Sequence, residues 1–177
     1  MGILINAGIG ILIAMSASGI VPVNANNGNA GIIHNVNSSS PPEAPDDADA
    51  IVDTFISRQA KKLGAEEYRE AREVRRGDVN RDGKSDVVVL YTLEGFGGGN
   101  SYTQYLAVFL GKRNDFRFAA NVMVGGKMIR NVSLKSVADG RIHFDTDEYR
   151  KNDPACCPSR KAKAVYMLSN GKLRSVK

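Results

Sequence analysis

Beyond residue 72, the chain alternates short apolar segments with turns, most of which contain glycine, and this pattern favours an antiparallel sheet. The segments span residues 73–78, 86–94, 102–110, 116–124, 128–137, 141–147, 161–168 and 172–176. Asp-Gly and Asn-Gly pairs separate several of them, and such pairs are strong hairpin signals because both residues tolerate positive φ. Consecutive hairpins predict an antiparallel β-meander of about seven or eight short strands.

One amphipathic helix is expected before the strands, over residues 47–63. Apolar residues recur in it at helical spacing, acidic residues open it, and Gly64 follows as a stop signal. A short second helix is expected over residues 65–72. The first helix should pack on one face or end of the sheet, so residues 47–177 are predicted to form a single α+β, mostly β, domain.

Residues 1–25 are typical of a signal peptide or an amino-terminal anchor. An apolar run over residues 9–14 is followed by small residues, and Val23-Asn24-Ala25 has the pattern of a cleavage site. No Lys or Arg precedes the apolar run, which leaves an uncleaved anchor open. Asn, Gly, Ser and Pro dominate residues 26–46, as in a disordered linker. We therefore expect a periplasmic or secreted protein with no stable membrane span after processing.

The charge is unevenly distributed along the chain. The formal net charge is +5, yet the first 53 residues contain five acids and no Lys or Arg. All 24 basic residues therefore lie in the remainder, which favours an acidic partner, a polyanion or an anionic surface. Because the basic residues alternate with acids and form no long runs, a basic surface without a specific target fits as well, and no specific nucleic acid is expected.

The segment 78–86 has the spacing of a calcium-binding loop. Side-chain oxygens occupy loop positions 1, 3, 5 and 9, glycine occupies position 6, and position 7 offers its backbone carbonyl. The candidate metal ligands are Asp78, Asn80, Asp82, Lys84 and Asp86. Ca²⁺ takes six to eight oxygen ligands, so calcium is the expected cofactor, in a structural role. The alternative is a plain hairpin turn with solvated carboxylates.

The loop departs from the EF-hand pattern, because position 12 is Val89 rather than a bidentate Glu. It resembles the nine-residue calcium loop of FG-GAP and VCBS-type β proteins, in which acids close the loop just before a strand. The likeness covers residues 78–90 and occurs once, so it implies calcium binding without implying a propeller. The single calcium hairpin in a small exported β-rich domain is also similar to periplasmic inhibitors of the lysozyme-inhibitor type, some of which act as immunity proteins. This second resemblance implies a loop that blocks an enzyme cleft.

Two further segments, the adjacent cysteines and a glycine-rich stretch, contain candidate functional residues. The only cysteines, Cys156 and Cys157, are adjacent and flanked by prolines, which predicts a vicinal disulfide that stiffens a turn in an oxidising compartment. A reactive thiol is the lesser alternative. The glycine-rich segment 95–102 is typical of a mobile hairpin connection, and the alternative is a recognition loop for a protein partner. The partner-binding candidates are Phe96, Asn100, Tyr102 and Tyr105.

These features predict an exported, calcium-stabilised binding protein without catalytic activity, such as an inhibitor or immunity protein for a cell-envelope enzyme. A polyanion-binding or cell-wall-binding module is the first alternative. The second is a hydrolase that uses the acidic residues Asp145, Asp147 and Glu148, although no nucleophile–histidine pair supports it.

Overall fold

The computed structural model describes residues 47–113 and 115–176. The predicted signal peptide or anchor (1–25) and the predicted linker (26–46) lie outside the described residues. In chain order the elements are α1 (Asp47–Leu63), β1 (Glu66–Glu67), η1 (Arg69–Ala71), β2 (Glu73–Gly77), β3 (Asp86–Glu94), η2 (Phe96–Gly98), β4 (Tyr102–Lys112), β5 (Asp115–Gly126), β6 (Arg130–Ala138), β7 (Arg141–Glu148), β8 (Arg160–Ser169) and β9 (Lys172–Val176). The prediction of a mostly β, α+β domain is confirmed.

The described strands form one antiparallel sheet of nine strands, in the order β1-β3-β4-β5-β6-β7-β8-β9, with β2 also paired to β3. From β3 onward each strand pairs with the next one along the chain, so the predicted meander is confirmed. β1 and β2 share one edge of β3, where β2 pairs with residues 86–90 and β1 with residues 93–94. The edge of β3 is therefore covered along most of its length.

Residues 65–72 form no α-helix, and the expectation of a second helix there is wrong. The segment consists of β1 followed by the single 3-10 turn η1. β1 pairs Glu66 with Glu94 and Glu67 with Leu93, at the part of β3 that β2 does not reach. Backbone groups on a buried strand need hydrogen-bond partners, and this non-local demand overrides the local helical spacing.

α1 begins and ends where the sequence predicts. The side chains that it buries as a stripe are Ala48, Val52, Ile56 and Ala60. At its end, Gly64 has φ +62°, and the Ala65 N–H donates to the Ala60 carbonyl at 3.0 Å. Glycine at a left-handed position with this bond closes the helix and directs the chain towards β1.

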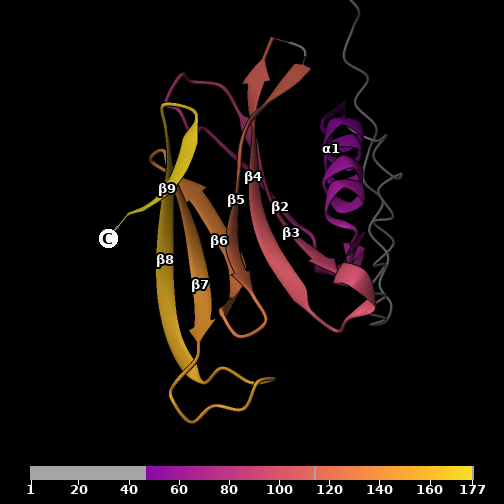
Figure 1. The fold of residues 1–177 in the computed structure, drawn as a ribbon. Coiled ribbons are helices and arrows are strands. Elements are labelled where there is room, and N and C mark those ends of the chain that lie inside the picture. Colours follow the sequence, from indigo (N-terminus) through magenta and orange to yellow (C-terminus); the bar gives the residue numbers. More distant parts are fainter. Residues whose placement is uncertain (1–46, 114, 177) are drawn as a thin grey trace, which may run out of the picture. The chain divides into compact units, whose positions relative to one another are not determined.

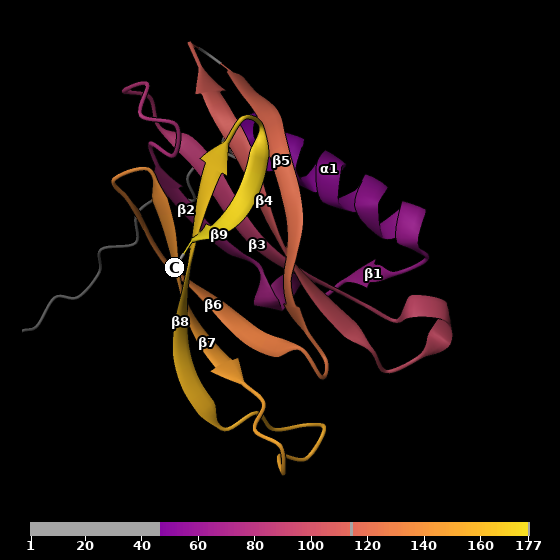
Figure 2. The same cartoon turned by 60° about the vertical axis from the view of Figure 1, so that its left-hand side comes forward.

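β3 is buried on both faces, which explains the continuous apolar run Val87–Tyr91. Val88 and Leu90 join a core cluster with side chains of β4–β9. Val87, Val89 and Tyr91 join a second cluster with α1. The result is three layers, with α1 on one side of β3 and β4, and β6–β9 on the other (Figures 1 and 2).

The pairing between β5 and β6 is short, and the two strands are joined by the turn that follows Gly126. Among the described residues, β5 and β6 share the single pair Gly126–Arg130. The strand predicted over residues 128–137 begins at Arg130, because Met128 and Ile129 belong to the turn and Met128 has φ +62°. This turn lies at the same end of the sheet as the β3–β4 connection and the β7–β8 loop (Figure 2).

Candidate metal loop and binding loops

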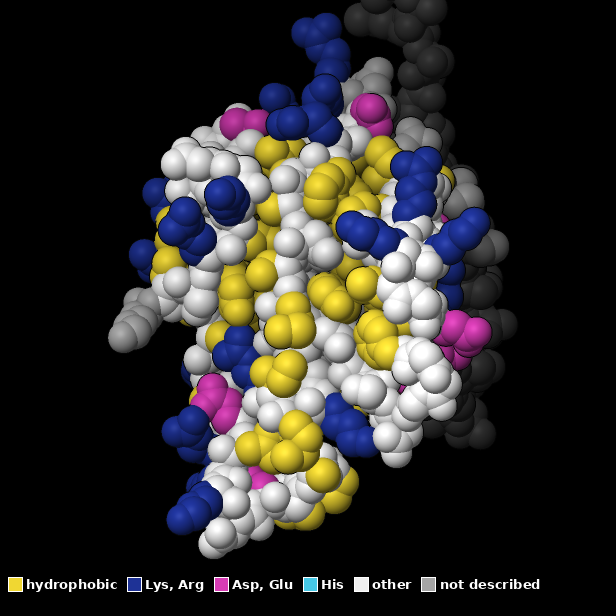
Figure 3. Space-filling model, viewed as in Figure 1, with side chains coloured by type: hydrophobic (Ala, Val, Ile, Leu, Met, Phe, Trp, Pro, Cys, Tyr) yellow, Lys and Arg dark blue, Asp and Glu magenta, His cyan; other side chains and the backbone are white. Residues whose placement is uncertain are grey.

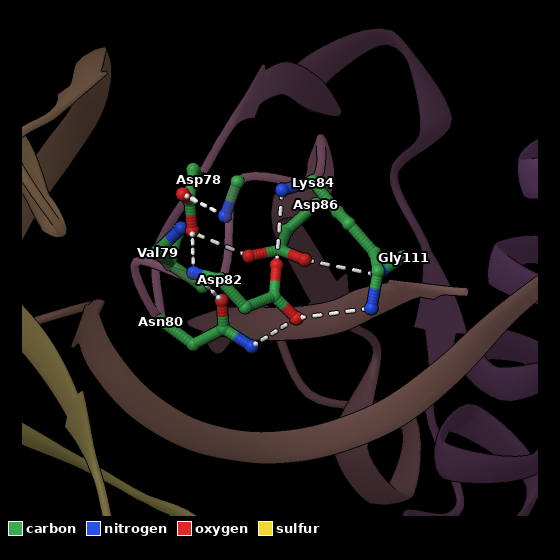
Figure 4. A network of polar contacts seen from close by, with 8 residues as sticks. Asp78, Val79, Asn80, Asp82, Lys84, Asp86 and Gly111 are labelled. Atoms are coloured by element: carbon green, nitrogen blue, oxygen red, sulfur yellow. Dashed lines mark hydrogen bonds and ion pairs between the residues drawn. The ribbon is translucent and has the colours of Figure 1, made fainter. Parts of the chain in front are cut away.

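The loop between β2 and β3 is held by its own backbone N–H groups (Figure 4). The Asp78 carboxylate accepts hydrogen bonds from Asp82 N–H at 3.1 Å and from Gly83 N–H at 2.8 Å. Asn80 Oδ1 also accepts from Asp82 N–H at 3.1 Å, and Asp82 Oδ1 accepts from Lys84 N–H at 2.9 Å. These bonds turn the oxygen side chains of positions 1, 3 and 5 towards the interior of the loop.

Asp86 closes the loop from a fully buried position. Its two oxygens accept backbone hydrogen bonds from Val79 N–H at 2.8 Å and from Gly111 N–H at 2.9 Å, so it joins the loop to β4. Burial raises the pKa of Asp86, the two backbone bonds oppose that rise, and the charges of Asp82 and Asp78 add to it. A buried carboxylate whose charge is disfavoured by two acidic neighbours is an environment that a cation would stabilise.

The two basic side chains of the loop point to different partners. Arg81 has φ +61° and donates from Nη2 and Nε to the Asp139 carbonyl, at 2.7 and 3.2 Å, which fastens the loop to the β6–β7 hairpin. Lys84 Nζ lies 3.5 Å from Asp82 Oδ2. Arg81 therefore serves as a tether to the neighbouring hairpin, while Lys84 partly neutralises Asp82.

The donor chemistry of the loop suits calcium. Its donors are hard oxygens, which are the ligands that Ca²⁺ takes in proteins. However, across residues 47–113 and 115–176, no three Asp, Glu, His or Cys side chains are grouped so as to hold a metal ion. Calcium binding by residues 78–86 therefore stays a prediction.

Two of the four predicted partner-binding residues lie on the helix side of the sheet. Phe96 and Tyr105 are partly buried against the cluster that contains α1. The Tyr105 ring stacks on that of Tyr91, with centroids 5.4 Å apart. Their aromatic area is already used in packing, so they are less available to a partner than the sequence suggests.

The other two candidates, Asn100 and Tyr102, contact the β5–β6 segment. Lys127 Nζ donates to Asn100 Oδ1 at 2.7 Å, and the Lys127 N–H donates to the Tyr102 carbonyl at 3.1 Å. The Tyr102 hydroxyl donates to Asn131 Oδ1 at 2.5 Å. The glycine-rich connection and the β5–β6 turn are thus fixed to each other.

The β7–β8 loop contains the disulfide between Cys156 and Cys157. Asp153 organises this loop by accepting hydrogen bonds from Arg150 N–H at 2.7 Å and from the N–H and hydroxyl of Ser159, both at 2.8 Å. These bonds lower the pKa of Asp153. The disulfide ring and the three hydrogen bonds to the Asp153 carboxylate therefore hold an exposed loop in one conformation.

The acidic residues of β7 are paired with basic residues. The pairs are Asp145 with Lys135 (3.1 Å), Asp147 with Lys161 (2.7 Å) and Glu148 with Arg160. The two aspartates line an open polar hollow of about 590 Å³ across β6, β7 and β8, together with Lys161 and Lys163. Opposite charges on neighbouring strands stabilise a sheet surface, which gives these acids a structural role.

An apolar group at the β5–β6 turn is a surface feature that sequence reasoning missed. Met123, Met128 and Ile129 are 49%, 60% and 49% exposed. Met123 and Ile129 line an open hollow of about 380 Å³ with Tyr149, whose hydroxyl donates to the Ala155 carbonyl at 2.8 Å. The available signal was a Gly-Lys-Met-Ile stretch in which large apolar residues stand where turns usually carry polar ones.

No protein-family model, curated protein or solved structure matches this chain. The resemblances to FG-GAP and VCBS-type calcium loops and to lysozyme-inhibitor-type proteins therefore remain predictions from the residues. α1, the one α-helix of the described ranges, is not long and apolar enough to cross a membrane.

Proposed function

We propose that this chain is an exported, calcium-stabilised binding protein that holds a protein partner of the cell envelope and performs no catalysis itself. The observation that carries the proposal is the cross-linking of Asn100 to Lys127 and of Tyr102 to Asn131. These bonds join the glycine-rich loop to the β5–β6 turn in a fixed arrangement. A preorganised recognition surface loses little conformational entropy on binding, which favours affinity.

Calcium would act in this proposal as a structural ion in loop 78–86. The support is the buried carboxylate of Asp86, the raised pKa that burial and its acidic neighbours cause, and the oxygen donors of Asp78, Asn80 and Asp82. A bound cation would offset the repulsion among these carboxylates and stiffen the start of β3. Because Asp86 also bonds to Gly111, the effect would reach β4.

The hydrolase alternative draws less support than the binding proposal. Its carboxylates, Asp145, Asp147 and Glu148, each lie beside a Lys or Arg, which favours an ionised and neutralised surface over a general acid. The polyanion alternative rests on the basic charge that follows residue 53. The polyanion alternative predicts an affinity that falls steeply as the salt concentration rises. Binding of a protein partner by the glycine-rich loop and the β5–β6 turn should depend on salt only modestly.

The proposal is tested by affinity capture from an envelope extract, followed by titration of the purified partner by calorimetry. Asn100→Ala and Tyr102→Phe should each weaken binding, by roughly fivefold to tenfold, because each removes one of the loop's cross-links. Lys112→Ala is the matched control, since Lys112 is exposed at the other end of β4. Equal affinity of all three variants, or no partner above background, would contradict the proposal.

A further inference from the structure

We propose that the end of the sheet formed by residues 123–130 and 149–160 is a docking surface for an anionic lipid bilayer. This surface, here called the apolar tip, presents Met123, Met128 and Ile129 to solvent. It is separate from loop 78–86 but includes the β5–β6 turn, to which Asn100 and Tyr102 are bonded. The inference goes beyond the proposed function and requires neither calcium nor a protein partner.

The apolar side chains of the tip protrude and are not folded inward. Met128 and Ile129 stand at the turn itself, 60% and 49% exposed, beside the hollow that Tyr149 lines. The β7–β8 loop next to it exposes Pro154, Ala155 and the Cys156–Cys157 ring. Figure 3 shows hydrophobic side chains gathered at the lower end of the molecule, with Lys and Arg side chains and some Asp or Glu side chains beside them. Soluble proteins seldom expose contiguous apolar groups of this kind without a use for them.

The backbone of the turn is strained at Met128, one of the residues whose side chain is exposed. Met128 has φ +62°, a region that Gly and Asn adopt readily and that an unbranched apolar residue adopts at a cost. The turn is held by Ile129 N–H, which donates to the Gly126 carbonyl at 3.0 Å, and by the Lys127 bonds to the β3–β4 connection. A strained residue that the surroundings hold in place is more frequent at functional sites than elsewhere.

The charges around the apolar tip indicate an anionic partner. Residues 126–130 and 149–160 contain five basic residues and one acid. Glu148 pairs with Arg160 and lies 4.0 Å from Arg130, whereas Lys127 bonds to a neutral amide and keeps its charge uncompensated by that contact. Arg150 and Lys151 are exposed at the start of the β7–β8 loop. The tip is therefore apolar at its apex and positive around it.

At the exposed apex of the turn, outside the glycine-rich loop, this combination favours a bilayer over a protein. Protein-binding hot spots are aromatic or arginine side chains that fill pockets, while the apex here carries Met and Ile on a protruding turn. Interfacial binding uses apolar side chains that enter the headgroup–acyl boundary and Lys or Arg that contact anionic headgroups. A protein-only surface would instead leave vesicles of any composition unbound.

The test uses the full chain, whose lack of tryptophan permits a reporter free of background. Ile129→Trp places the reporter at the tip, and Arg113→Trp places a matched one in the β4–β5 turn, at the opposite end of β4. Each is titrated with vesicles of equimolar phosphatidylcholine and phosphatidylglycerol, and with phosphatidylcholine alone. We expect the Ile129→Trp emission to shift to shorter wavelength with the anionic vesicles, and this shift should be smaller in high salt. The Arg113→Trp emission should stay constant.

Two sets of variants separate the tip from the rest of the chain. Arg150→Gln with Lys151→Gln should lower the vesicle partition coefficient by about fivefold for each charge removed, and Lys112→Gln with Arg113→Gln should lower it less. Met128→Asn should weaken binding without harming the fold, because Asn accepts the positive φ. No spectral shift at position 129, equal shifts at positions 129 and 113, or equal losses from the two charge pairs would overturn the proposal. Equal losses would point to binding through other residues, including the predicted amino-terminal segment.

Discussion

The side-chain amide of Gln104 pairs with the backbone of Val132 as a neighbouring strand would. Its Nε2 donates to the Val132 carbonyl at 3.0 Å, and its Oε1 accepts from the Val132 N–H at 2.9 Å. The contact compensates for the short ladder between β5 and β6, which contains the single pair Gly126–Arg130. Gly125 makes room for it, since a Cβ there would lie 2.7 Å from Gln104 Oε1.

Replacing Gln104 with Met should destabilise the domain by about 1–3 kcal/mol. The substitution keeps the side-chain volume but removes the partners of two backbone groups of Val132, which is 4% exposed. Urea denaturation measures the change. Gln59→Met, at a partly exposed position of α1, is the control and should change the free energy of unfolding by less than about 0.5 kcal/mol. Equal midpoints for both variants would show that the Gln104 bonds add no net stability.

Gly111→Ala should be strongly destabilising because β4 passes close to the end of the metal loop. A Cβ at this position would lie 2.3 Å from the Ser85 carbonyl oxygen, and Gly111 N–H is a partner of Asp86. Relieving the clash requires backbone movement, so we expect a loss of about 1–3 kcal/mol or more by thermal and urea unfolding. In the control Gly99→Ala, the nearest atom, the Phe96 carbonyl oxygen, would be at an ordinary 3.5 Å, and stability should change little.

The ion pair that fixes α1 to the segment before β2 should contribute stability that acid removes. Burial acts to raise the pKa of Asp53, but hydrogen bonds from Arg72 at 2.5 Å and Arg69 at 3.1 Å outweigh it, so the folded-state pKa lies below the ordinary 3.8. The contribution is then complete above about pH 4 and is lost as the pH falls through the folded-state value. The Asp53 side chain is 39% exposed, so screening limits the contribution to less than about 1 kcal/mol.

Asp53→Asn should therefore flatten the dependence of unfolding free energy on pH between about pH 5 and pH 2.5. Asp139→Asn is the control, at an exposed turn position where Asn accepts the positive φ equally well. The measurement is a series of urea melts across this range. Asp139→Asn should lose stability in acid as steeply as the parent. If Asp53→Asn does so too, the Asp53–Arg72 pair is not the source of the effect.

Calcium should raise the melting temperature of the parent protein and leave that of Asp82→Ala unchanged. With a dissociation constant of ~10⁻⁴–10⁻³ M, the range of extracellular calcium modules, ~5 mM calcium would stabilise the fold by about 1–2 kcal/mol, or a few degrees. Asp115→Ala, an exposed acid outside the loop, should retain the calcium response. Identical melting curves of the parent in calcium and in chelator would remove calcium from the proposed function.

The elements that local patterns specify agree with the structure. Helical spacing followed by Gly64 predicts the limits of α1, and the Asp-Gly and Asn-Gly pairs predict the hairpins at 139–140 and 170–171. The failures occur where the decisive contact is distant in sequence. Residues 65–72 become β1 because the far end of β3 lacks a partner, and residue 128 becomes a turn because β6 leaves β5 after one pair.

The candidate sites divide in the same way. The spacing of residues 78–86 places oxygen side chains around one loop, because a nine-residue loop brings its own members together wherever it lies. Nothing local indicates that Asp86 is fully buried and bonded to Gly111, or that Arg81 reaches the Asp139 carbonyl. Likewise, Phe96 and Tyr105 are aromatic candidates by composition, and only the tertiary structure shows that they are partly buried against the cluster that contains α1.

The sequence by itself determined the helix, the order of hairpins and the members of the oxygen-rich loop, since each depends on residues within about a dozen positions of one another. Tertiary structure decided which side chains are left for function. It buried β3 between two layers, paired the acids of β7 with neighbouring bases, and left Met123, Met128 and Ile129 exposed among basic residues. The physical reason is that burial and charge pairing depend on contacts between strands far apart in the chain, which no local pattern encodes.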